Sequence, residues 1–242
     1  MAATTATTAG DEPAYPPTDR TVPTRLRERA RYDRELVHAV LDEGYLCHLG
    51  YLHDGAPVVL PTLYARRGER LYLHGSTGSR PVRAAAAPDR RRDGAPQDEE
   101  DGLPVCVTVT HVDGLVLAKS AFHHSVNYRS VMVHGVARPV TDPEEHLLAL
   151  SALVDHVVPG RAADCRPPAP KEAAATAVLA LDLREVSAKV RGGGPGEEPE
   201  DVSLPHWSGV LPVSVVHGPF VPADGPQPDG PAPDYLTAYA RP

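Results

Sequence analysis

The segment LYLHGSTGSR, residues 71–80, places groups that bind anions directly after a strand-like apolar pattern. Its end, GSTGSR at 75–80, offers backbone N–H groups, hydroxyls and the guanidinium of Arg80 just before PVRAAAA, which is typical of a helix. That set of donors fits a phosphate. Serine, threonine and glycine are also ordinary turn residues, so a simple turn is the alternative interpretation.

Other chemistries find less support. His123 and His124 are adjacent, and adjacent side chains on a strand point to opposite faces, so they do not easily chelate one metal ion. No GxSxG elbow occurs, and Cys47 and Cys106 lie in apolar strands that are typical of a core. We therefore predict no metal site and no activated nucleophile.

Strands make up most of the elements that must position these residues. Apolar residues recur at helical spacing in 31–44, which stops at Gly44 as a candidate C-terminal cap, and in 143–158. Between them, alternating segments and tight turns predict an antiparallel meander over 45–75, a hairpin around Asp113 and Gly114, and strands over 128–140 and 177–191. Six or seven strands with two or three helices and no βαβ alternation predict a closed or partly closed antiparallel barrel.

Composition narrows the class of protein. With 242 residues and 41% hydrophobic content, one domain is expected. A net charge of -8 without a continuous positive stripe argues against nucleic acid as the main partner. Three widely spaced cysteines fit neither a disulfide framework nor a metal knuckle, and no segment resembles a signal peptide or a membrane span, so a cytoplasmic protein is expected.

Three segments are too poor in apolar side chains to offset the entropy of ordering them. They are an N-terminal tail at 1–20, a Pro/Gly-rich C-terminal tail at 222–242, and a solvated insertion loop at 88–102 that carries a basic cluster before an acidic one. The predicted domain is therefore 21–221.

The order of the segments carries a family resemblance. GYLCHLGYLHDGAPVVLPTLYARRGERLYLHGSTGSR is followed by VCVTVTHVDGLVLAKSAFHHSVNYRSVMVHGVARPV, then SAKVR and HWSGVLPV. Across 31–216 this order resembles the pyridoxamine 5′-phosphate oxidase-like flavin-nucleotide-binding proteins, and more narrowly the nitroimidazole-resistance reductases. The resemblance implies a mainly β fold with flanking helices, the antiparallel split β-barrel, and a homodimer that binds FMN at its interface with residues of both chains.

The resemblance also implies individual site residues. The phosphate would lie at Ser79 and Arg80, where the family often has a lysine after the arginine and this chain has Pro81. Ser76 belongs to the same phosphate turn. The other implied flavin neighbours are Pro61, Thr62 and Leu63 beside the ring, His74 and Gly75 at its edge, and Phe122, His123, His124, Ser125, Asn127 and Tyr128, partly from the neighbouring chain. Trp207 would lie near the flavin or the dimer interface, or else anchor the core beneath the last strand.

In function, the resemblance implies an FMN-dependent oxidoreductase that performs two-electron chemistry on a small molecule, nitroreductase-like in character. His74 would donate a proton to the substrate, or alternatively hydrogen-bond backbone at a strand end. Relatives of this fold bind deazaflavin or haem in place of FMN, and a flavin-binding protein without turnover stays open as well.

Overall fold

The computed structural model describes residues 13–87 and 101–239. Most of the predicted insertion loop at 88–102, and the first twelve residues of the predicted N-terminal tail, lie outside these ranges. Within them, no helix has both the length and the apolar character needed to cross a membrane.

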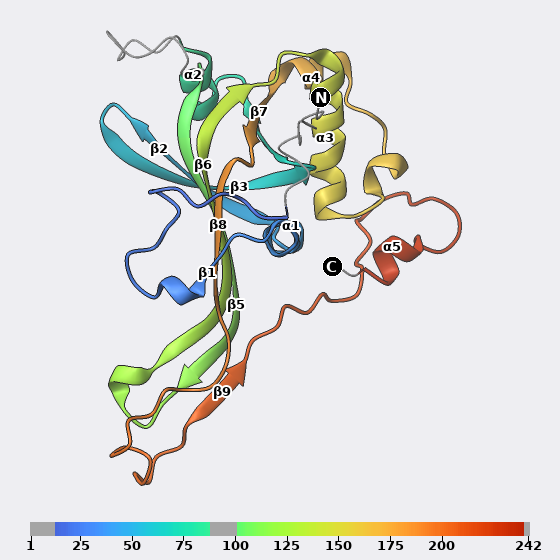
Figure 1. Ribbon diagram of the computed structural model, residues 1–242. Coiled ribbons are helices and arrows are strands. Elements are labelled where there is room, and N and C mark those ends of the chain that lie inside the picture. Colours follow the sequence, from blue (N-terminus) through green and yellow to red (C-terminus); the bar gives the residue numbers. More distant parts are fainter. Residues whose placement is uncertain (1–12, 88–100, 240–242) are drawn as a thin grey trace, which may run out of the picture.

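The described residues form one antiparallel sheet that closes into a ring (Figure 1). The strand order is β1-β8-β6-β7-β4-β3-β2-β5-β9, and β6 also pairs with β5, which closes the ring through six strands. This confirms a mainly antiparallel β fold with few flanking helices, consistent with the split-barrel fold. The strands are β1 (Ala30–Arg31), β2 (Leu46–His53), β3 (Ala56–Arg67), β4 (Arg70–Ser76), β5 (Leu103–Leu117), β6 (Ser125–Pro139), β7 (Thr176–Asp182), β8 (Glu185–Arg191) and β9 (Gly209–Pro212).

The core fills the ring, and two longer helices cover it. α1 (Arg34–Glu43) buries Val37, Val40 and Leu41 against the ring interior, as helical spacing predicts. α3 (Pro143–Val157) packs on the outside of the sheet, and Asp142 caps it by accepting a hydrogen bond from the Glu145 N–H at 2.7 Å. Shorter helices are α2 (Arg80–Ala86), α4 (Pro170–Ala175), α5 (Asp234–Thr237), η1 (Arg27–Arg29), η2 (Ala121–His123) and η3 (Arg161–Asp164).

Two predictions about strands are wrong. Asp113 and Gly114 do not form a hairpin turn, because β5 continues through them and its register with β6 shifts between Val112 and Gly114. Asp-Gly is a strong turn signal, but here β5 stays paired with the long strand β6 on both sides of the dipeptide. The extra residue therefore forms a β-bulge in β5. The predicted strand over 177–191 is two strands, β7 and β8, which separate after Asp182.

Gly44 ends α1 for a reason other than the one expected. Its φ of -75° is available to any residue, so it is no left-handed cap. A Cβ at this position would lie 2.7 Å from both Tyr64 Oη and Val109 Cγ1. The glycine is therefore needed because the helix end packs directly on the core.

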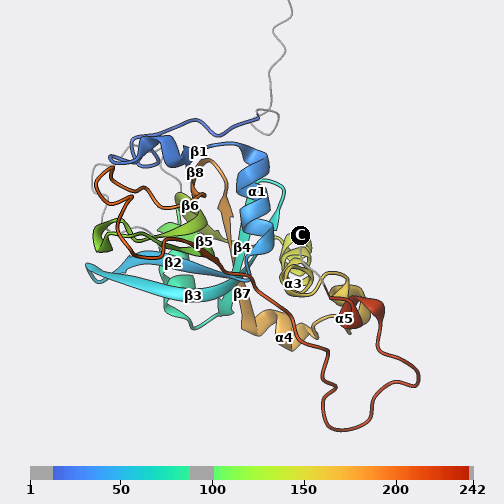
Figure 2. The same ribbon diagram turned by 90° about the horizontal axis from the view of Figure 1, so that it is seen from below.

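Segments near both ends of the chain contact the body of the protein. The Tyr15 side chain is buried, and its hydroxyl donates to Glu69 Oε2 at 2.7 Å. A C-terminal strap, residues 213–239, runs from β9 through α5 and contacts the C-terminal end of α3, where the Tyr239 hydroxyl donates to the Val157 carbonyl (Figures 1 and 2). On this strap, His217 and Tyr239 each hydrogen-bond to the Tyr45 hydroxyl.

Candidate functional site

The ring opens between β3 and β4, next to several predicted site residues. The last registered pair of these strands is Tyr64 with Leu73, and residues 56–63 of β3 then pair only with β2. Pro61 and Leu63 lie on the open part of β3, and His74 lies just beyond the separation on β4. Thr62 points to the opposite face of β3 from its two neighbours, since side chains alternate along a strand.

The turn from β4 into α2 contains an orphaned polar atom. Ser79 Oγ is buried and has no hydrogen-bond partner among the described residues. The backbone around it is ordered, because Ser79 N–H donates to the Ser76 carbonyl at 2.9 Å and Arg83 N–H donates to the Ser79 carbonyl at 3.0 Å. A buried hydroxyl without a partner is costly unless a ligand or water satisfies it.

Gly75 and Arg80 complete this turn. A Cβ on Gly75 would lie 3.0 Å from Ser79 Oγ, so the glycine keeps space free beside the hydroxyl. The Arg80 side chain is exposed and makes no hydrogen bond or ion pair within the described part of the chain. Ser79 and Arg80 therefore suit a phosphate group, as the sequence predicts.

His74 is exposed, and so is His48, which the sequence analysis did not single out. His48 pairs with Pro61 across β2 and β3, so its imidazole lies on the same face of the sheet as the Pro61 ring. Neither histidine has a hydrogen-bond partner among residues 13–87 and 101–239, whereas the rings of His111, His146 and His156 bond to backbone carbonyls at 2.7–3.0 Å.

The second group of predicted site residues lies on an arm, defined by residues 114–127 and 209–212, which projects from the ring (Figure 1). Phe122 is 88% exposed at its tip, and Trp207, just before β9, is 98% exposed. An anchoring role for Trp207 in this chain's own core is therefore wrong. His123, His124, Ser125 and Tyr128 are at least partly exposed.

Asn127 differs from the others in the arm group. It is buried, its Nδ2 donates to the Gly193 carbonyl at 3.0 Å, and its Oδ1 accepts from the Arg191 guanidinium. Its side-chain amide therefore holds the glycine-rich loop after β8, and a role toward a flavin is not visible in these contacts.

The two groups of predicted residues do not meet within one chain. Pro61 is aligned with Thr108 through His48, while Ser125 is aligned with Val116. Val116 is eight positions after Thr108 on β5, which is about 26 Å at the rise of an extended strand. Figure 1 likewise places α2 and the arm at opposite ends of the molecule.

One face of the sheet, here called the outer face, carries many exposed apolar side chains. The pairings of β3, β2, β5, β6 and β9 place these side chains together, opposite to those in the ring interior. Monomeric proteins seldom expose so many contiguous apolar groups. The outer face includes Leu46, Leu52, Val59, Val112, Leu115, Leu117, Val126, Met132 and Leu211, all exposed.

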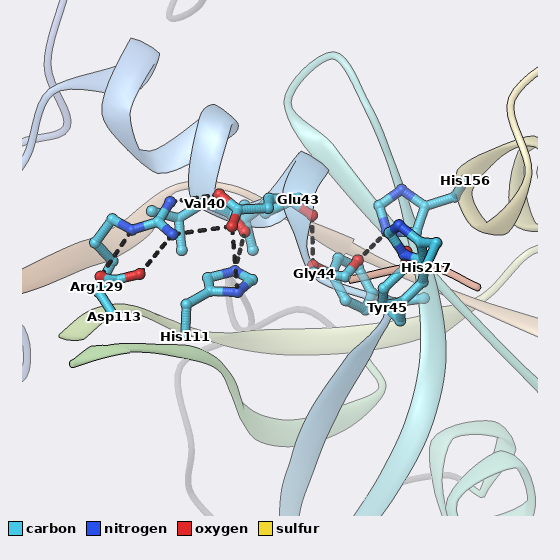
Figure 3. A network of polar contacts seen from close by, with 11 residues as sticks. Val40, Glu43, Gly44, Tyr45, His111, Asp113, Arg129, His156 and His217 are labelled. Atoms are coloured by element: carbon cyan, nitrogen blue, oxygen red, sulfur yellow. Dashed lines mark hydrogen bonds and ion pairs between the residues drawn. The ribbon is translucent and has the colours of Figure 1, made fainter. Parts of the chain in front are cut away.

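A polar network at the C-terminal end of α1 supports the base of the arm (Figure 3). Arg129 donates to both carboxylate oxygens of Asp113, at 2.8 and 3.0 Å, and also to both of Glu43. Hydrogen bonds from Arg129 lower the pKa of Glu43, and its positive charge adds to that effect. The network thus ties the bulge residue of β5 to α1 and β6.

Comparison with known proteins gives one family match. A family model described as pyridoxamine 5′-phosphate oxidase matches residues 33–190, more than half of the chain. No curated protein matches.

Two solved structures are similar over nearly the whole chain. The flavocytochrome Anf3 from Azotobacter vinelandii is 37% identical, covers 93% of this chain and 98% of its own, and has a TM-score of 0.81. A FAD and heme binding protein from Mycobacterium smegmatis is 32% identical, covers 88% and 98%, and has a TM-score of 0.77. A protein described as a 5-nitroimidazole antibiotic resistance protein, from Bacteroides thetaiotaomicron, is 19% identical over 66% of this chain and 86% of its own, with a TM-score of 0.51, and shows the fold alone.

Proposed function

Because this chain belongs to the pyridoxamine 5′-phosphate oxidase family, we propose that it is a redox protein that binds a flavin nucleotide and haem. One observation carries the proposal. Two structures above 30% identity align with almost the full length of the chain, one named a flavocytochrome and the other a FAD and heme binding protein. Family membership favours the flavin, and these two relatives favour haem beside it.

The flavin phosphate is proposed at Ser79 and Arg80. The orphaned Ser79 hydroxyl supplies a donor, the Arg80 guanidinium supplies charge, and Gly75 leaves the space between β4 and α2 open. The flavin ring would then extend toward Pro61 and Leu63, where β3 has no partner on that edge. The family resemblance favours FMN, whereas the name of the mycobacterial relative favours FAD, and both nucleotides carry the phosphate that this turn would bind.

The haem is proposed on the outer face. Haem needs an axial ligand and apolar walls, and His48 and His74 are exposed imidazoles without partners in the described ranges. His48 projects from β2 between Leu46 and Gly50 on a face rich in exposed apolar side chains. His48 is therefore the candidate axial ligand of the haem.

A homodimer is proposed to complete the site. The two groups of site residues lie too far apart to contact one cofactor in a single chain, and Phe122 and Trp207 are too exposed for a monomer's surface. A second copy that packs on the outer face would bury the exposed apolar groups there and bring its own arm toward the β4–α2 turn.

Each bound group would supply a different redox step. A flavin exchanges two electrons and haem iron exchanges one, and the chain's residues orient and insulate both. His74 lies where β3 and β4 separate, and we propose that it passes a proton to a small-molecule substrate.

The visible absorption spectrum of the purified protein tests the proposal. We expect a flavin band together with a Soret band, and an extract analysed by chromatography identifies FMN or FAD. Reconstitution of apoprotein with FMN, FAD and haemin, followed by gel filtration, checks that each chromophore travels with the protein. A protein that retains neither chromophore after reconstitution would contradict the proposal. A flavin band without a Soret band would contradict the part of the proposal that concerns haem.

A further inference from the structure

The N-terminal edge of the sheet carries a cluster of arginines around one exposed leucine. We define this arginine edge as Arg25, Leu26, Arg27, Arg29 and Arg31, which belong to η1, β1 and the residue pair before them. Glu28 is the single acidic residue within it. The chain as a whole has a net charge of -8, so this edge opposes the charge of the rest of the molecule.

These arginines are not used to hold the fold together. The side chains of Arg25, Arg27 and Arg29 make no hydrogen bond or ion pair with the described residues, and the Arg31 guanidinium donates only to the carbonyls of Glu28 and Ala30, at 2.6 and 2.8 Å. The flanking arginines behave differently, because Arg20 pairs with Glu185 and Arg34 pairs with Glu69.

Leu26 is exposed and strained. Its φ of 55° and ψ of 49° put it in the left-handed region, which branched and bulky side chains seldom occupy. Its side chain is 45% exposed, so burial in this chain does not offset the strain. Strained residues that gain little from their own fold tend to occur where another molecule is bound.

We propose that the arginine edge is a docking surface for an acidic protein that carries electrons. The choice of an electron carrier rests on the proposed redox function. An exposed apolar side chain flanked by arginines along the chain matches the composition of binding hot spots, and guanidinium groups pair well with carboxylates. In each productive encounter, one electron leaves the carrier's metal cluster and enters a cofactor of this protein, and no bond is formed or broken.

The shape of the edge favours a protein over a membrane. Membrane-surface segments are usually amphipathic helices with aromatic side chains, whereas η1 spans three residues and the arginine edge has no aromatic side chain. Unpaired arginines on an acidic molecule also steer an acidic protein to one place, because the remaining surface repels it.

The position of the edge connects it to the outer face. Ala30 pairs with Lys189 of β8, and Lys189 pairs with Ser130 of β6, next to Met132 on the outer face. Figure 1 shows β1 beside β8 along the same sheet. A carrier on the arginine edge would therefore lie at the rim of the face on which the haem is proposed.

Binding of a purified acidic [2Fe–2S] ferredoxin, measured by calorimetry, tests this proposal. We expect affinity at low salt that falls steeply as the ionic strength rises. Arg27→Glu should weaken binding by about tenfold, and the combination with Arg25→Glu and Arg29→Glu should weaken it further. Arg67→Glu, the same charge reversal on exposed β3, is the matched control and should change affinity by less than about twofold.

Leu26→Gly separates recognition from folding. Glycine accepts the left-handed backbone without strain, so the free energy of unfolding should stay the same or rise. Ferredoxin affinity should nevertheless fall, because the apolar contact is lost. If the variant is at least as stable as the wild type and binds ferredoxin as tightly, Leu26 does not take part in ferredoxin binding.

The outcomes distinguish this inference from the proposed function. Salt-sensitive ferredoxin binding through Arg27, in a protein that retains neither flavin nor haem, would support the docking surface and contradict the redox proposal. A protein with both chromophores that binds neither ferredoxin nor an acidic flavodoxin at low salt would overturn the inference. It would also be overturned if Arg27→Glu abolished binding to phosphatidylglycerol vesicles while ferredoxin did not bind.

Discussion

Gly75 and Ser79 face each other across the turn between β4 and α2, so closely that a Cβ on residue 75 would lie 3.0 Å from Ser79 Oγ. The hydroxyl on one side has no partner within the described ranges, and the missing side chain on the other keeps the adjoining space open. This pair is the structural basis for placing a phosphate there.

Gly75→Ala should lower flavin affinity by roughly tenfold, because the added methyl group displaces the Ser79 hydroxyl by a few tenths of an ångström. Fluorescence titration of the apoprotein with FMN and FAD measures the effect. Gly78→Ala is the control, since a Cβ there would meet nothing within 4 Å. Equal affinity for all three proteins would argue against a ligand at this turn.

Arg80→Ala should weaken flavin binding by about 10- to 100-fold, the range for loss of a hydrogen-bonded charge. Equilibrium dialysis with FMN and FAD provides the measurement. Arg67→Ala removes another exposed arginine and should leave the affinity unchanged. If Arg80→Ala binds flavin normally, the phosphate does not lie at this guanidinium.

His74→Ala should slow turnover of a quinone or nitroaromatic acceptor by about 100-fold while flavin stays bound, because a proton donor contributes in this range. His53→Ala, on the β2–β3 hairpin, is the control. Loss of the Soret band in His74→Ala would instead assign His74 to the haem and contradict the proton-donor role.

Leu115→Arg should convert the proposed dimer to a monomer, because it places a charge in the middle of an apolar row. Val126, Leu115 and Leu211 are aligned across three adjacent strands of the arm, and all three are exposed. Light scattering coupled to gel filtration measures the mass. Leu147→Arg, at an equally exposed leucine of α3, should not change it. A wild-type protein that is already monomeric would contradict the proposal.

Glu43→Gln should lower the free energy of unfolding at pH 7 by about 1–3 kcal/mol, since two hydrogen bonds from Arg129 lose their charged acceptor. Those bonds depress the pKa of Glu43 in the folded state, so the stabilisation exists above about pH 4.3, where an unfolded glutamate is ionised. It is lost as the pH falls through the lower folded pKa. Urea unfolding at pH 7 and pH 3 should therefore show a smaller pH dependence for Glu43→Gln than for the wild type or the exposed control Glu35→Gln.

Alternation along the chain was enough to predict β2, β3 and β4, because each strand has one face inside the ring. The same rule failed at Asp113 and Gly114, where a local turn signal competed with a long partner strand that lies ten or more residues away. Local propensity does not include the partner, so a bulge and a turn look alike in the sequence.

Burial of Tyr15 had no signal in the sequence, because the surrounding threonines and prolines are typical of a tail. For His48 a signal was present. LCHLGYL carries apolar residues on both faces of β2, which indicates a strand that is covered on both sides, but the outer face of β2 is exposed in the described chain. Only the family resemblance placed the predicted residues of the arm at the same flavin as those of the β4–α2 turn. In a single chain the fold holds these two groups of residues far apart.

The bulge at Asp113 also determines which changes in length β5 can accept. Val112 pairs with Tyr128 and Gly114 pairs with Asn127, so Asp113 is the one residue of β5 at this point that has no partner on β6. Deletion of its codon would leave a regular strand, in which Leu115 and Leu117 keep their exposed face and Val116 keeps its buried one. An inserted residue at the same place would instead have to enlarge the bulge or reverse every side chain that follows it.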